Sequence, residues 1–365
     1  MSSLPALRLV GPLEREERPR LAVPEVVTPA PRQAWARLIA DDPHALVTQT
    51  PAWTDCMCAT TGSRDASRLY DFGGGRKLLL PLVDLRRRPG LYASFPSAWG
   101  FGGLVGADPQ PGEIRAVLND LRANCALGVR VRTNPLQHAA WAAGRPAGVA
   151  ALPRRAHAID LREGFEHVWK HGFSSRARNH VRRAERAGVR VEVDTTGQLA
   201  PVFHGLFMQS VERWAAKQHE PVALARLRAR RRDPLEKLRR MVADLDGAGR
   251  LWVAYVEERP AAAILVLQGA NAHYTRGAMD ADLAGPSRAN YLLHRLAIED
   301  ACRSGCATYQ MGETGDSRSL AQFKESLGAE PHDYAEYVIE RFPMTAVDRG
   351  VRGAAKRFLR FKDHD

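Results

Sequence analysis

The sequence predicts an α/β (α+β) protein made of two tandem units, each a mixed sheet flanked by helices. The chain has 365 residues, more than a single hydrophobic core usually serves, so two domains are expected. With 45% hydrophobic and 26% charged residues, the composition is that of a folded protein in water. The third observation is a repeated order of elements: a strand or hairpin, a helix and a strand.

The first copy of this order begins after Pro31. Apolar periodicity and turn residues predict a helix over 32–40, a second helix after 49–53, a strand over 77–85, a glycine- and aromatic-rich stretch over 91–103, a helix over 113–127 and a strand over 129–132.

The second copy repeats the order with a clearer pattern. It is predicted to contain a helix over 202–217, a hairpin of strands 250–256 and 261–268, a strand over 272–279, a helix over 290–304 and a strand over 306–311. Gly128 and Gly305 follow the equivalent helices and are predicted to be their C-caps. A unit of this kind can splay two central strands apart and bind an acyl donor in the gap.

An arginine-rich helix is predicted between the copies, over 173–188, with a serine N-cap and a terminating glycine. It leads into a strand over 189–193. Farther along, Asp233 is predicted to cap a helix in the manner of a capping box, with Pro234 at N1 and Glu236 at N3.

The two ends of the chain differ from the copies. Residues 1–31 contain six prolines and are predicted to form a flexible arm. Residues 342–365 are predicted to form a basic helix with apolar residues on one face, suited to docking on the protein's own body or on a membrane surface. The predicted domains are therefore 1–31, 32–160, 161–341 and 342–365.

The formal net charge is +12, a surplus that attracts polyanions. Genomic base bias toward arginine and alanine explains such a surplus equally well. The five cysteines show no paired CxxC spacing, so neither a disulfide framework nor a metal site is predicted. The sequence lacks the long apolar run of a membrane span and the apolar stretch of a signal peptide, which predicts a cytoplasmic protein without integral membrane insertion.

Four segments together resemble the FemAB-like tandem-GNAT family. They are the arginine-rich run 178–191, the strand pair around 259–264, the segment 274–280 and the run Leu320-Ala-Gln-Phe-Lys-Glu-Ser-Leu-Gly328. The resemblance covers about residues 49–341, and the order and spacing of the segments are specific although each one is weak alone.

The resemblance implies an aminoacyltransferase that moves an amino acid from aminoacyl-tRNA to an amine of a small-molecule or peptide acceptor and forms an amide. Relatives in the wider group are GNAT-fold acetyltransferases. The first unit would lie on the acceptor side and the second on the donor side, with aminoacyl-tRNA as co-substrate and no tightly bound cofactor. By the same resemblance Lys324 is the cationic donor for the developing oxyanion, and Phe323 precedes it in the motif. A solvated lysine near a helix start is the alternative.

Further candidate residues border the predicted gap and the basic helix. Arg178 and Arg182, four residues apart, could hold phosphates bidentately; a solvated basic face paired with acids such as Glu185 is the alternative. The basic run 226–232 is a second candidate for RNA contact. Tyr274, Asn290, Gly312 and Glu313 fall at strand ends and a helix start. Glu313 or Asp316 could accept the proton of the attacking amine, or simply cap a turn.

The sequence departs from the patterns of related proteins in ways that bear on the acyl donor and on the amine acceptor. The stretch 282–290 lacks the (Arg/Gln)-x-x-Gly-x-(Gly/Ala) loop that binds the pyrophosphate of coenzyme A, which favours tRNA over acyl-CoA as the donor. Met57 stands where members acting on nucleotide-linked muropeptides tend to have a lysine, and residues 217–247 are too few for a coiled-coil arm, which puts peptidoglycan in doubt as acceptor. An acyl-CoA-dependent GNAT N-acyltransferase and a non-enzymatic RNA-binding protein remain alternatives.

Overall fold

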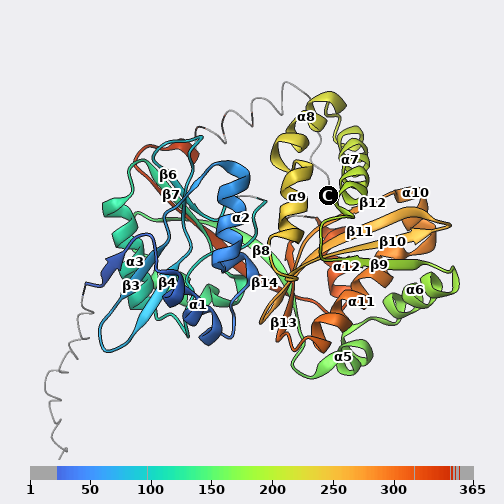
Figure 1. The fold of residues 1–365 in the computed structure, drawn as a ribbon, viewed down its shortest axis with the longest axis horizontal. Helices are drawn as coiled ribbons and strands as arrows, with labels where there is room; N and C mark the ends of the chain where they lie inside the picture. The colour runs from blue at the N-terminus through green and yellow to red at the C-terminus, as the bar shows by residue number, and fades with distance from the viewer. Residues whose placement is uncertain are drawn as a thin grey trace, which may run out of the picture.

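Two lobes joined by one sheet make up the protein in the computed structural model, which describes residues 23–96, 98–315, 317–345, 347, 350 and 353 (Figure 1). The first lobe carries α1 to α4, and the second carries α5 to α12. Within these residues no helix is long and apolar enough to cross a membrane.

The main sheet has 11 strands. In spatial order they are β2 (Arg64–Asp65), β5 (Val83–Asp84), β6 (Leu91–Ser94), β7 (Gly128–Arg132), β14 (Glu330–Glu340), β8 (Ala150–Asp160), β13 (Thr308–Glu313), β12 (Ala272–Met279), β11 (Arg259–Gln268), β10 (Gly249–Val256) and β9 (Arg190–Asp194).

A smaller sheet of three strands lies in the first lobe: β1 (Glu25–Val27), β3 (Arg68–Asp71) and β4 (Lys77–Leu80). Its first strand corrects the predicted arm over 1–31, because Glu25 pairs with Asp71 and Val27 with Leu69. Val26 packs against the first lobe's core, and this contact gives the proline-rich segment a fixed strand. Residues 1–22 lie outside the described part of the chain.

The predicted tandem arrangement is confirmed by two parallel strand pairs of the same construction. In the first lobe β6 lies parallel to β7, and α3 (Pro111–Asn124) connects them. In the second lobe β12 lies parallel to β13, and α11 (Ala289–Arg303) connects them. Parallel strands need such a crossover, so each strand–helix–strand segment predicted from the sequence forms one repeat.

The sheet does not separate at the boundary predicted between residues 160 and 161. Strand β8 pairs with β13 on one side and β14 on the other, and β14 pairs in turn with β7. The end of the second predicted domain therefore completes the sheet of the first. Backbone pairing of this kind is decided by tertiary structure, and turn signals along the chain do not reveal it.

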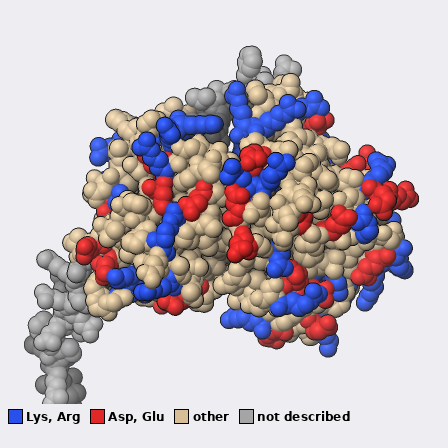
Figure 2. Space-filling model, viewed as in Figure 1, with Lys and Arg blue, Asp and Glu red and all other residues tan. Residues whose placement is uncertain are grey.

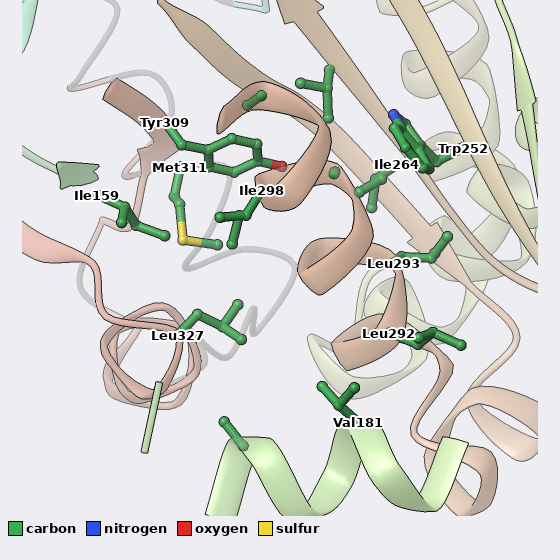
Figure 3. Packing of buried hydrophobic residues seen from close by; sticks show 14 of the residues in the cluster. Ile159, Val181, Trp252, Ile264, Leu292, Leu293, Ile298, Tyr309, Met311 and Leu327 are labelled. Atoms are coloured by element: carbon green, nitrogen blue, oxygen red, sulfur yellow. The ribbon is translucent and has the colours of Figure 1, made fainter. Parts of the chain in front are cut away.

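Helices cover both faces of the second lobe's sheet. One face packs against α5 (Gly164–His167), α6 (Ser175–Arg186) and α11, and Figure 3 shows Val181 of α6 rising toward Leu292 and Leu293 of α11. The other face packs against α7 (Ala200–Lys217) and α9 (Leu235–Ala243), with α8 (Val222–Arg232) against α7 and the first lobe's α2 (Pro51–Thr61) against α9. Alternate residues of β10 enter the two cores, as the two-residue period of a strand requires: Trp252 and Ala254 on one face, Leu251 and Val253 on the other.

The remaining helices are short or belong to the first lobe. They are α1 (Arg32–Asp41), η1 (Val47–Gln49), η2 (Pro135–Gln137), α4 (His138–Gly144), η3 (Val168–Gly172), α10 (Ala281–Ser287) and α12 (Arg318–Ser326).

Three helix-end predictions have different outcomes. Gly305 follows α11 with φ +77°, in agreement with its predicted role. The C-cap prediction for Gly128 is wrong, because α3 ends at Asn124 and Gly128 is the first residue of β7. The N-cap prediction for Asp233 is also wrong: its carboxylate is buried in an ion-pair cluster with Lys237 and Arg276, so it does not bond to the first amides of α9. Asp316 and residues 354–365 lie outside the described chain.

Candidate active site

A split between two central strands is the main irregularity of the second lobe. Strands β12 and β13 pair at only two positions, Ala272 with Tyr309 and His273 with Gln310. Beyond them β12 shifts register against β11 between Leu265 and Val266, and β13 shifts against β8 between Gln310 and Glu313. The main-chain groups that β12 turns toward β13 beyond this point have no strand partner, which leaves hydrogen-bonding groups at the edge of the split.

Tyr274 lies at the start of the split. Its phenol extends over Gly277, where an added Cβ would stand 2.2 Å from the hydroxyl oxygen. Only glycine accommodates this side-chain position. Burial raises the pKa of Tyr274 to about 12, so the hydroxyl keeps its proton at neutral pH and is available as a hydrogen-bond donor.

Lys324 projects from α12 to the end of β13. It is 1% exposed, and its Nζ donates to the carbonyl oxygens of Gly312 (2.9 Å) and Glu313 (2.8 Å) and to Oγ1 of Thr314 (3.1 Å). An ammonium group has three donors, and these bonds use all of them. A direct hydrogen bond from Lys324 to an oxyanion therefore requires exchange of one of them. In the observed geometry the lysine instead holds the end of β13 in place.

Glu313 is the charged group that this anchoring positions. Its Oε1 accepts a hydrogen bond from the hydroxyl of Tyr334, and Oε2 lies 3.6 Å from the guanidinium of Arg132. Arg154 approaches to 3.9 Å. The side chain is 33% exposed, so the carboxylate faces solvent from a defined position.

Phe323 and Asn290 close the split from the helix side. Phe323 packs edge-on against Tyr291 and His294 of α11, with ring centroids 5.1 and 5.4 Å apart. Asn290 lies in the first turn of α11, and its amide contacts Sδ of Met279 at the end of β12. The structure thus brings Tyr274, Gly312 and Phe323 to the split, with Lys324 bonded to the end of β13 and Asn290 in the first turn of α11. The Glu313 carboxylate instead turns toward Tyr334, Arg132 and Arg154.

Arg178 and Arg182 lie apart from this group, on α6. Arg178 donates to the main-chain carbonyls of Trp169, Lys170 and Phe173, so it is occupied in holding the segment before its own helix. Arg182 is exposed, contacts Asn179 and lines a shallow surface hollow with Arg186. Only Arg182 of the predicted pair is therefore free for phosphate.

Two buried side chains that the sequence did not indicate connect Lys324 to the surface. Nδ1 of His157 lies 2.7 Å from Oγ1 of Thr314, and Nε2 lies 3.5 Å from the half-exposed carboxylate of Glu325. Burial, and then the nearby lysine, lower the pKa of His157, which favours a neutral ring. A single histidine between the two predicted copies gives no sequence signal for this connection.

A second buried cluster joins the two lobes. Lys237 Nζ donates to Oδ1 of Asp233 (2.9 Å) and to the carbonyl oxygen of Ala98 (2.9 Å), and the guanidinium of Arg276 also reaches Asp233 (2.7 Å). Lys237 also lies over the ring of Trp99 at 4.2 Å. The neighbouring cations lower the pKa of Asp233 despite its burial, so the carboxylate stays ionised. This cluster ties the first lobe to α9 and β12.

A groove at the junction of the lobes leads to Glu313. Strands β8 and β14 form its floor, and α4 and the residues after β13 stand on either side. Its polar lining comes from His138, Arg145, Arg154, Arg155, Glu313, Asp333, Tyr334 and Tyr337.

Comparison with known proteins agrees with this architecture. Residues 172–332 match the family model of the acetyltransferase (GNAT) domain. The crystal structure of FemX is similar over 87% of this chain and 97% of its own, with a TM-score of 0.60 at 13% identity. A conserved protein of unknown function from Bacteroides thetaiotaomicron VPI-5482 is similar over 86% and 99%, with a TM-score of 0.52 at 9% identity. No curated protein matches the sequence.

Residues 172–332 thus match a GNAT acetyltransferase domain, and the chain shares its fold with FemX over most of both chains, so the predicted resemblance is confirmed. At these identities the solved structures establish the fold alone.

Proposed function

We propose that the protein is an aminoacyltransferase that moves an amino acid from aminoacyl-tRNA to an amine acceptor and forms an amide. The observation that carries the choice of donor is the basic surface of α6. Among the residues that the structure describes, no carboxylate lies within ion-pair distance of Arg176, Arg182, Arg183 or Arg186. Unpaired guanidinium groups in a row attract successive phosphates.

The arginines of α8 are different, although they are as numerous in the sequence. Figure 2 shows basic side chains gathered over α8 at the top of the molecule. Arg226 is paired with Glu212, Arg228 with Glu220 and Arg232 with Asp233, each at 2.7 Å. These pairs neutralise much of the strip, which leaves α6 as the stronger candidate for RNA contact.

Helix α6 lies beside the site. It packs against α11, and the ring of His180 contacts that of Tyr291 in the first turn of α11 at 4.7 Å. Tyr291 in turn contacts Phe323, next to Lys324. A phosphate backbone held on α6 is therefore close enough to present an acyl ester to the split between β12 and β13.

The segment before α11 favours an RNA-linked ester over coenzyme A. Short helix α10 occupies residues 281–287, with Pro286 inside it and the Ser287 hydroxyl bonded to the carbonyl of Leu283. A glycine-rich loop at this place would turn several amides toward a pyrophosphate. Here a helical turn uses those groups internally.

The chemistry requires one bond to form and one to break. The lone pair of the acceptor amine attacks the ester carbonyl carbon, and the Tyr274 hydroxyl donates to the carbonyl oxygen as charge develops there. The acyl C–O bond then breaks, and its electron pair stays on the ribose oxygen. Glu313 takes the proton from the amine nitrogen and passes a proton to the ribose oxygen, which leaves as a hydroxyl group. Lys324 keeps Glu313 in position through the end of β13.

Transfer from labelled aminoacyl-tRNAs to a mixture of amines tests the proposal. Ribonuclease-sensitive formation of labelled amide is expected, and Arg182→Gln/Arg186→Gln should weaken it at least about tenfold through loss of phosphate contacts. Arg86→Gln/Arg87→Gln removes the same charge from an exposed turn of the first lobe and should leave transfer close to that of the wild type. Absence of transfer from every aminoacyl-tRNA, or equal losses in both double variants, would contradict the proposal.

An acyl-CoA-dependent N-acyltransferase is the second candidate, favoured by the match of residues 172–332 to an acetyltransferase family. Calorimetry with acetyl-CoA and longer acyl-CoAs separates the two. Micromolar binding accompanied by acyl transfer to an amine would replace tRNA with coenzyme A as the donor.

A further inference from the structure

An aromatic strip made of three rings runs over the second lobe from α6 to α12. The ring of His180 on α6 contacts that of Tyr291 on α11 with centroids 4.7 Å apart, and Tyr291 contacts Phe323 of α12 at 5.1 Å. All three side chains are partly buried, so each keeps part of its surface in solvent. Single exposed apolar residues are ordinary, whereas adjoining rings from three helices form a surface that favours a ligand.

The middle ring of the aromatic strip has an uncovered face. Tyr291 makes an interplanar angle of 46° with His180 and of 73° with Phe323. Neither neighbour is therefore stacked flat on it, and both meet it with an edge. Packing fixes this arrangement, because Val181 beside His180 and Leu292 beside Tyr291 are buried in the core shared by α6 and α11.

Three arginines surround the His180 end of the strip. Arg176 and Arg183 lie four residues before and three residues after His180, on the same side of α6, and Arg288 precedes the first residue of α11. Burial, and then Arg288, Arg176 and Arg183, lower the pKa of His180, so its ring is uncharged at neutral pH. Across the described residues no carboxylate lies within ion-pair distance of these arginines, and Nε of Arg288 is buried without a hydrogen-bond partner.

Aromatic faces beside unpaired guanidinium groups suit a ligand that joins a flat ring to phosphate. A nucleic-acid duplex offers the phosphates, but its bases are stacked inside the helix and do not reach protein rings. An unpaired nucleotide offers both groups. Because every base has a flat face, stacking of this kind binds without reading the sequence.

We propose that the aromatic strip binds an unpaired nucleobase, stacked on Tyr291 beside His180, with the adjoining phosphates on Arg176, Arg183 and Arg288. The base comes either from the single-stranded 3′ end of an RNA or from the adenosine of a coenzyme. The inference rests on the proposed function for the RNA source, whereas the stacking of a base on the strip is a separate property. Tyr291 is a binding residue in this arrangement and touches no reacting atom.

Binding of short RNAs without any acyl group tests the inference. Labelled single strands of about six nucleotides, either intact or lacking one base near the 3′ end, are titrated by fluorescence anisotropy at several salt concentrations. Tyr291→Leu keeps an apolar side chain against Phe323 but removes the flat ring, and Tyr291→Phe keeps the ring. Tyr255→Leu is the matched control, because Tyr255 is likewise partly buried and lies 4.5 Å from the guanidinium of Arg190, on β10.

Tyr291→Leu should weaken binding of the intact single strand about 5- to 100-fold, as loss of one base–aromatic stack does, without changing the salt dependence. Tyr291→Phe and Tyr255→Leu should bind like the wild type. Removal of the stacked base should weaken binding to the wild type by a similar factor and should cost Tyr291→Leu nothing further. Arg176→Gln/Arg183→Gln should instead reduce the salt dependence, because phosphate contacts release counterions.

Titrations with acetyl-CoA and with phosphopantetheine, which lacks the nucleoside, identify the source of the base. Ring-dependent binding of acetyl-CoA in place of RNA would support the strip as a base site and count against aminoacyl-tRNA as the donor. Equal affinities for intact and base-lacking RNAs, wild-type binding by Tyr291→Leu, or an equal loss in Tyr255→Leu would overturn the inference. Transfer from aminoacyl-tRNA in any of these cases would leave the proposed function intact.

Discussion

The two lobes contain the same parallel strand pair, yet only one of the pairs opens. In the first lobe β6 and β7 pair at four positions, and the chain after β6 returns to add a bridge between Gly102 and Thr133. In the second lobe β12 and β13 pair at two positions and then separate. The topology of a repeat therefore does not determine whether it offers a gap, because the residues after the first strand decide it.

The returning segment of the first lobe is fixed by close packing. Gly102 donates to the carbonyl oxygen of Arg132, and buried Gln49 donates to the carbonyl oxygens of Gly102 and Leu104. After β12 the chain instead continues into α10, away from β13. In the first lobe, the returning segment fills the gap beside the parallel strands. In the second lobe, the corresponding gap is free for a substrate.

The largest expected effect tests whether the second lobe helps to hold this filling segment. Asp233→Ala leaves Lys237 and Arg276 as buried cations without their carboxylate, and it should lower the free energy of unfolding by about 3–5 kcal/mol. Urea denaturation measures the change. Asp333→Ala removes an exposed partner of Arg155 and should cost less than about 1 kcal/mol. Similar costs for the two variants would show that the lobes do not depend on the Asp233 cluster.

The next-largest expected effect, on kcat, tests whether the reaction depends on the second lobe's open split. Glu313→Gln keeps the shape of the side chain but removes the proton acceptor, and it should lower kcat about 10²-fold or more with the melting temperature little changed. Asp333→Asn alters a neighbouring carboxylate of the same groove and should leave kcat near the wild-type value. If Glu313→Gln retains full activity, another group accepts the proton.

A smaller expected effect, on stability, tests how tightly the returning segment packs against the β6–β7 pair. A Cβ at Gly102 would lie 2.4 Å from Oγ and 2.6 Å from the carbonyl carbon of Ser94, so Gly102→Ala should destabilise the protein by about 1–3 kcal/mol through overpacking. Gly205→Ala in α7 meets nothing within 4 Å and should stabilise the protein by up to about 1 kcal/mol. Thermal unfolding compares them. A neutral Gly102→Ala variant would mean that the segment adjusts freely.

The smallest expected effect, on the free energy of unfolding, concerns the end of the second strand in each parallel pair: β7 in the first lobe and β13 in the second. After β7, the neutral side chains of Thr133 and Asn134 donate hydrogen bonds to backbone carbonyls. At the end of β13, the side chain that donates to a backbone carbonyl is instead that of Lys324. Burial lowers the pKa of Lys324 to about 7, against opposition from Glu313. Between pH 7 and 10 the unfolded chain binds a proton here that the folded chain does not, so the free energy of unfolding rises with pH by at most about 1.4 kcal/mol per unit.

Lys324→Met should therefore reduce this slope. It should not abolish the slope, because burial also lowers the pKa of Lys237 to about 7 and Lys237 contributes in the same direction. Denaturation curves at pH 7, 8, 9 and 10 provide the measurement. An unchanged slope in the Met variant would show that Lys324 stays charged throughout.

The helices, the strands and their repeated order follow from local sequence pattern. Apolar periods of 3.6 and 2 residues with glycine and proline at the ends place α7, α11 and the β10–β11 hairpin within a residue or two of their observed bounds. The order of these elements was enough to predict the tandem fold and to direct attention to the segment around Lys324. Local pattern carries this information because helix and strand formation depend first on neighbouring residues.

Which strands pair and which side chains meet could be read only from the tertiary structure. Insertion of β14 between β7 and β8, the bridge between Gly102 and Thr133 and the ion pair of Asp233 with Arg276 all join residues far apart in the sequence. Side-chain packing also decided the shorter-range contacts that occupy every donor of Lys324 and hold Arg178 on nearby backbone carbonyls. A charged residue looks alike in sequence whether solvated or enclosed, and only its packed surroundings show which groups remain free to meet a substrate.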